Sequence, residues 1–112
     1  MTKRLLAILE HICQSYNQLC ADIKTVDAKR YDQMLNRLMN VKPLSINYSR
    51  PPKEVVKGNF ENGHKAYVLA NGYLCSCTSF KMNNRNQMGQ KIPCKHLAIL
   101  AGNAVLHVWR QS

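Results

Sequence analysis

Two pairs of metal-binding side chains, separated by one loop, constrain this chain more than any other feature of its sequence. Cys75 and Cys77 form the first pair, Cys94 and His96 form the second, and the 16 residues 78–93 lie between them. Three thiolates and one imidazole are the donors that zinc prefers in a closed, tetrahedral structural site. The sequence therefore predicts that these four side chains bind one structural Zn²⁺ ion. Ordinary buried thiols beside a helix-start histidine are the alternative.

A β-hairpin is predicted to carry the first pair of ligands. Residues 65–69 and 73–77 are rich in side chains that favour strands, and Asn71-Gly72 stands between them. Asn-Gly in this position is typical of a hairpin, because both residues tolerate a positive φ. Side chains alternate along a strand, so we expect Cys75 and Cys77 to point to the same face and to reach one ion.

A helix is predicted to carry the second pair. Residues 97–101 have helical composition and are followed by Gly102-Asn103, which we expect to end the helix as a C-cap. Cys94 and His96 would then lie at its first turn. The segment 104–109 alternates and contains two valines, so it either adds a last strand or extends the helix.

The pattern Cys-x-Cys, a variable loop and Cys-x-His, flanked by a strand pair and a helix, resembles the SWIM-type zinc finger. The resemblance covers roughly residues 64–103. It implies a role in DNA binding or protein interaction, and the family includes Shu-complex subunits that assist homologous recombination. Those members usually place an alanine three residues after the histidine, where this chain has Ile99, and its alanines fall at Ala98 and Ala101.

The N-terminal region predicts two amphipathic helices. Apolar residues recur at steps of three and four from Leu5 to Ile23, which indicates a helix from about Lys3 to Lys24. Thr25 or Asp27 can cap a second helix, whose apolar stripe is formed by Tyr31, Met34, Leu35, Leu38 and Met39. Two such helices leave one apolar face uncovered, so that face must contact the zinc module or another chain.

The predicted fold class is therefore α+β, with an N-terminal helical hairpin followed by a small β-hairpin-plus-helix zinc module. Residues 1–42 form the hairpin and offer a surface for a partner or a second copy of the chain. Residues 43–63 are a connector that includes a strand at 44–48, and residues 64–112 are the SWIM-like zinc finger. A chain of 112 residues is long enough for one compact domain.

Basic residues dominate the C-terminal half of the chain. The formal net charge is +10, and no Asp or Glu follows Glu61, whereas Lys65, Lys81, Arg85, Lys91, Lys95 and Arg110 do. Such a surface attracts polyanions, of which nucleic acid is the commonest; solubilising charge is the alternative. Segment 78–93 is predicted to be an exposed, mobile basic loop, and the phosphate-binding residues expected in this region are Lys81, Arg85, Lys91 and Lys95.

Three functions follow from these features. The first is binding of nucleic acid, expected to be DNA, in recombination, replication or transcription. Phe80 or Tyr73 could then stack on an unpaired base, although a core role is favoured for both. The second is a protein adaptor that uses the helices and the zinc finger, as a homodimer or with another protein. Catalysis ranks lowest, because four ligands fill the zinc shell, so the chain is not expected to be an enzyme.

The remaining cysteines and histidines are not expected to bind metal. Cys13 and Cys20 flank the first helical stripe as small hydrophobes, and His11, His64 and His107 are isolated in the sequence. No stretch approaches 18 apolar residues, so no membrane contact is expected. An odd cysteine count and the absence of a recognisable signal peptide favour a reducing compartment, the cytoplasm or the nucleus.

Overall fold

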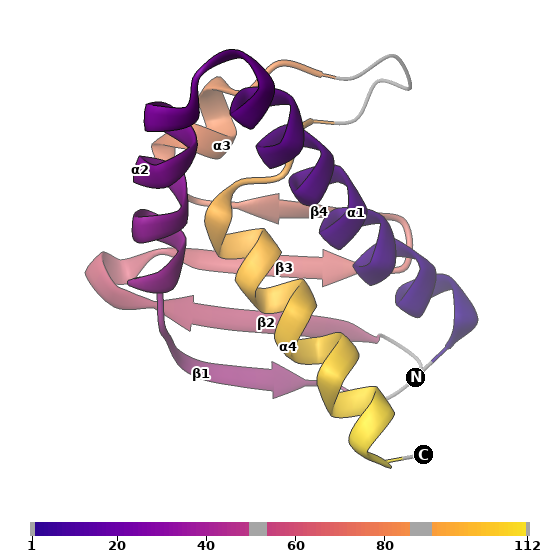
Figure 1. Cartoon of the computed structure of the whole chain (residues 1–112). Helices are drawn as coiled ribbons and strands as arrows, with labels where there is room; N and C mark the ends of the chain where they lie inside the picture. The colour runs from indigo at the N-terminus through magenta and orange to yellow at the C-terminus, as the bar shows by residue number, and fades with distance from the viewer. Residues whose placement is uncertain (1, 50–53, 86–90, 112) are drawn as a thin grey trace.

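The computed structural model describes residues 2–49, 54–85 and 91–111, which form an α+β fold with two long helices across one face of a four-stranded sheet (Figure 1). This confirms the predicted fold class. The elements in chain order are α1 (Lys3–Val26), α2 (Ala28–Met39), β1 (Pro43–Tyr48), β2 (Val55–Phe60), a 3₁₀ turn (Glu61–Gly63), β3 (Lys65–Leu69), β4 (Gly72–Cys75), α3 (Thr78–Met82) and α4 (Lys95–Gln111).

The sheet is an antiparallel meander in the order β1-β2-β3-β4. It contains the expected hairpin (β3 and β4) and the strand expected at 44–48 (β1), joined by β2, which was not expected. The 3₁₀ turn joins β2 to β3 with Asn62 and Gly63 at φ 64° and 76°, a left-handed conformation that costs little for these two residue types. Sequence analysis assigned β2 to the connector. Lys57-Gly58-Asn59 interrupts its apolar pattern, and Gly58 is needed because Leu100 of α4 occupies the space that a side chain there would fill.

One core unites α1, the sheet and α4. Leu5, Leu9 and Ile12 of α1 are buried against α4 and the sheet, so the apolar face of the first helix meets the C-terminal module of the same chain. Segments 1–42, 43–63 and 64–112 all contribute to this core. Its other members include Val56, Phe60, Val68, Leu97, Leu100, Ala101 and Ala104.

The second helix is less buried than the first. Asp27 separates α1 from α2, and its side chain accepts a hydrogen bond from the Arg30 backbone N–H at 3.0 Å, which is one of the two caps predicted. None of the residues of α2 is fully buried, and Met39 is 71% exposed. The apolar stripe of α2 is therefore only partly covered by the described chain.

The last helix does not end at Gly102-Asn103, so the predicted C-cap is wrong and the alternative, an extended helix, is correct. The Asn103 side-chain amide donates to the Ile99 carbonyl at 2.8 Å instead of ending the helix. Burial of Ala104 favours continuation, and His107 stacks on Tyr48 of β1 with ring centroids 4.2 Å apart. Among the helices described, none is both long and apolar enough to cross a membrane.

Candidate metal centre

The structure brings the four predicted ligands into one buried cluster. One donor atom from each of Cys75, Cys77, Cys94 and His96 lies within 4.8 Å of every other, and the four residues are 4–6% exposed. An ideal tetrahedron built on Zn–S and Zn–N bonds has edges of about 3.5–3.8 Å. The donor atoms therefore need to approach one another by only about 1 Å to enclose an ion of this size, and the cluster can hold one metal ion.

The first two ligands come from a strand end and a helix start. Cys75 is the last residue of β4, whereas Cys77 lies beyond the strand, so the prediction of a strand through residue 77 is wrong. Cys77 caps α3, where its Sγ atom accepts a hydrogen bond from the Phe80 backbone N–H at 3.4 Å. This helix buries Phe80 and thereby turns the chain toward the core, which leaves both sulfur atoms facing the same cluster.

The second two ligands lie where α4 begins. The Cys94 carbonyl accepts from the Ala98 N–H at 3.0 Å, and His96 lies in the first turn. His96 Nδ1 is 4.0 Å from Cys94 Sγ, so this ring nitrogen faces the sulfur atoms. The partial positive charge at a helix N-terminus favours thiolates beside it, which suits a site built from deprotonated cysteines.

The four side chains of the cluster differ in how far their pKa values are shifted, and in which direction. A hydrogen bond with Cys94 lowers the pKa of Cys75 to about 6, and the same bond, together with burial, raises the pKa of Cys94. Burial raises the pKa of Cys77 and lowers the pKa of His96 to about 4. The lowered pKa of Cys75 favours its thiolate and the lowered pKa of His96 favours its neutral imidazole, so a metal ion bound here would have to displace the protons of Cys77 and Cys94.

The other histidines have separate surroundings. His11 lies 3.3 Å from the Ser15 hydroxyl on α1, and His107 stacks on Tyr48. His64 is different, because its ring centroid lies 5.0 Å from that of His96. His64 is isolated in the sequence, and no local signal could reveal this contact, because it depends on how the start of β3 packs beside the start of α4.

The four residues expected to bind phosphate have different environments. Lys91 Nζ donates to the carbonyls of Lys81 at 2.6 Å and Phe80 at 3.3 Å, so this ammonium group stabilises the end of α3. The Arg85 and Lys91 backbones form an isolated β-bridge. Lys81 is exposed, and Lys95 is half-buried beside the metal ligands.

The segment 78–93 is not simply an exposed loop, because it begins with α3 and buries Phe80. Tyr73, the other aromatic considered for base stacking, is half-buried and its hydroxyl donates to the Lys91 carbonyl at 2.6 Å. Both aromatics therefore have the core role that was favoured. The prediction of a mobile loop falls partly on residues 86–90, which lie outside the described residues.

A basic groove adjoins the metal centre. It encloses about 510 Å³ between α1 and α2 on one side and α3 with residues 92–95 on the other. Arg30, Arg37 and Lys95 line it, together with apolar side chains such as Ile23 and Met34. The part of the chain described here contributes no carboxylate to this lining.

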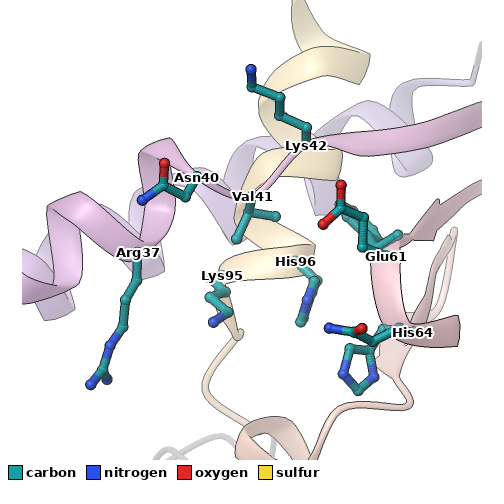
Figure 2. Close-up of a pocket in the computed structure, with 10 residues that line it drawn as sticks. Arg37, Asn40, Val41, Lys42, Glu61, His64, Lys95 and His96 are labelled. Atoms are coloured by element: carbon teal, nitrogen blue, oxygen red, sulfur yellow. The ribbon is translucent and has the colours of Figure 1, made fainter.

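A second pocket of about 300 Å³ shares Arg37 and Lys95 with the groove and extends to His96 and His64. Figure 2 shows the Arg37 side chain on α2 and the Lys95 side chain at the start of α4, with His64 approaching His96 from the turn before β3. Glu61 supplies the carboxylate of this pocket.

Arg30 and Arg37 were not among the predicted phosphate-binding residues, because those were sought in the segment after Glu61, which has no acidic residue. Their spacing of seven residues, with Met34 between them, places all three on one helix face and could have indicated a basic stripe. Comparison of the chain with protein-family models, with curated proteins and with solved structures gave no significant match.

Proposed function

We propose that this chain is a zinc-stabilised nucleic-acid-binding module, with DNA as its ligand. Its function rests on one observation: Arg30, Arg37 and Lys95, which come from two different helices, converge on one groove beside the metal centre. Cationic side chains in this arrangement attract phosphates and release the counterions condensed on a nucleic acid. The SWIM resemblance of residues 64–103 supports the same function, in recombination, replication or transcription.

Zinc is the proposed occupant of the cluster. Its three sulfur donors and one imidazole nitrogen match the soft and borderline ligands of structural zinc sites. The role proposed for the ion is to connect the end of β4, the start of α3 and the start of α4, which places Lys95 at the groove. The module is proposed to be non-catalytic, because four protein ligands leave zinc no open position for water.

Fluorescence anisotropy with labelled DNA tests the groove. In the zinc-loaded full chain, the double variant R30Q/R37Q should weaken binding roughly tenfold and reduce the slope of log affinity against log salt by about 0.7–0.9 per lost phosphate contact. The matched control K3Q/K29Q removes the same charge from exposed helix positions that line neither pocket. Binding that is insensitive to salt, or no binding at low ionic strength, would exclude this function.

A protein adaptor is the second candidate, and the partly covered apolar stripe of α2 favours it. Met39 at the end of α2 and Val26 at the end of α1 are 71% and 84% exposed, and no residue of α2 is fully buried. A partner or a second copy of the chain could cover this surface. Light scattering over a range of protein concentrations tests self-association, and a monomer at every concentration would leave only a different protein as the partner.

A further inference from the structure

The face of the sheet opposite α1 and α4 is open in the described chain. Strand side chains alternate, so that Val56, Gly58 and Phe60 of β2 are buried beneath the helices, whereas their neighbours point to the other face. Leu74 of β4, on that other face, is 49% exposed. In Figure 1 the two long helices cross the near side of the sheet, and the open face is the far side.

An aromatic ring lies near the centre of this open face. Tyr67 of β3 is half-buried and pairs across the sheet with Lys57 on β2 and with Leu74 on β4. The Lys57 ammonium group lies 5.7 Å from the centroid of the Tyr67 ring. Lys65, two residues before Tyr67 on the same strand, points to the same face and is exposed. The sheet thus presents a half-buried aromatic ring with one cation over it and a second on the same strand.

The charge of this face has one sign. The acids nearest in sequence, Glu54 and Glu61, are directed elsewhere: Glu54 accepts from the Thr2 backbone N–H at 2.8 Å before α1, and Glu61 lines the pocket at His96. Among the strand residues described, the remaining polar groups of the open face are amides and a hydroxyl, and the Asn59 amide donates to Ser45 at 2.9 Å. A surface with cations, hydrogen-bonding groups and an aromatic ring, but no carboxylate, is complementary to a polyanion that carries planar rings.

We propose that this open sheet face binds single-stranded nucleic acid, with a base that displaces the Lys57 ammonium group from the Tyr67 ring and stacks there, and with phosphates contacted by Lys57 and Lys65. Unpaired bases can expose a π-face to a flat protein surface, whereas the bases of a duplex are already stacked on their neighbours. The inference rests on the proposed nucleic-acid function and deepens it, because it assigns a second surface and names the single strand as its ligand.

The decisive measurement compares oligothymidine affinity with and without the Tyr67 ring. In the zinc-loaded full chain, Y67A should weaken binding of a labelled oligothymidine by roughly 5- to 140-fold, the range expected when one base loses its stacking partner. Y67F keeps the aromatic ring and should bind like the unmodified chain. Affinity for a labelled duplex should change little in either variant, because that ligand offers no free base to stack.

The lysines are tested by salt dependence. K57Q/K65Q should reduce the slope of log affinity against log salt by about 1.4 for oligothymidine, since each contact with a single strand contributes about 0.7. The control K3Q/K29Q removes two exposed charges from α1 and α2 and should leave that slope unchanged. Zinc content and circular dichroism establish that each variant is folded, and if Y67A is not, the lysine variant decides alone.

The outcomes separate this inference from the function on which it rests. If Y67A and K57Q/K65Q bind oligothymidine like the unmodified chain while R30Q/R37Q binds poorly, the proposal for the open sheet face is wrong. The proposed function of the basic groove is then retained. Failure of the unmodified chain to bind any nucleic acid overturns both. If Y67A disrupts binding of a partner protein and leaves oligothymidine affinity unchanged, the face is a protein interface and the proposal is wrong.

Discussion

Gly58 of β2 faces Leu100 of α4 so closely that a Cβ atom added at Gly58 would lie 2.9 Å from Leu100 Cδ1. The same atom would lie 3.0 Å from the Phe60 ring, and both neighbouring side chains are buried. This close approach seats α4 on the sheet. Because α4 begins directly after Cys94 and carries His96, the packing at Gly58 also positions two of the four candidate metal ligands.

We expect Gly58→Ala to destabilise the fold by about 1–3 kcal/mol, the usual cost of overpacking a filled core. Gly102→Ala is the matched control, because a Cβ at this helical position meets nothing within 4 Å. It should stabilise α4 by about 0.5–1 kcal/mol. Urea denaturation of the zinc-loaded chain measures both changes, and equal effects of the two alanines would contradict the packing described at Gly58.

Cys77→Ser should abolish tight zinc binding and unfold the shared core, α1 included, because Cys77, Leu5 and Leu9 belong to the same buried cluster. Zinc binding to small modules is coupled to folding by about 10 kcal/mol or more. Native mass spectrometry should detect one zinc ion per unmodified chain and none in the variant. Cys20→Ser removes a half-buried thiol outside the cluster and should retain the ion. A Cys77→Ser chain with intact tertiary circular dichroism would exclude a structural metal.

Zinc uptake should release protons and should strengthen as the pH rises. Cys77 and Cys94 have raised pKa values, so both hold protons at neutral pH, whereas the pKa of Cys75 is lowered to about 6. His96, with its pKa lowered to about 4, is already neutral and releases none. Between pH 7 and 8, displacement of two protons predicts an affinity gain of about 100-fold per pH unit. Competition with a chromophoric chelator at several pH values measures it, and a pH-independent affinity would contradict this assignment of protons.

Substitution of Lys91 should affect stability, whereas substitution of Lys81 should affect DNA binding, although both residues are lysines. Lys91 Nζ donates to two carbonyls at the end of α3, so Lys91→Gln should lower the free energy of unfolding by about 1 kcal/mol. Lys81 is exposed, and Lys81→Gln should leave stability unchanged while weakening DNA binding slightly. Thermal unfolding and anisotropy, measured on both variants, test this division. A destabilised Lys81→Gln chain beside an unaffected Lys91→Gln chain would reverse it.

Local sequence patterns determined much of this fold. The ligand residues, the first helix and the hairpin of β3 and β4 were predictable, because ligand spacing and side-chain periodicity are properties of neighbouring residues. Asp27 was predictable as a cap for the same reason, since a cap satisfies amide groups only two or three residues away.

Tertiary structure decided the rest. Gly58 interrupts the apolar pattern of the central strand β2, so the strand was not predicted; packing against Leu100 leaves no room for a side chain there. Burial of Ala104 favours continuation of α4 through Gly102-Asn103, a pair that often ends a helix. Arg37 and Lys95 line one pocket, and the His64 ring lies beside the His96 ring, although more than thirty residues separate each pair in sequence. The sequence alone specified which side chains could bind a metal ion. Only the packing of α1, α2 and α4 against the sheet determined which cationic and aromatic side chains lie beside the candidate metal ligands. Contacts between segments that are distant in sequence leave no pattern in local periodicity.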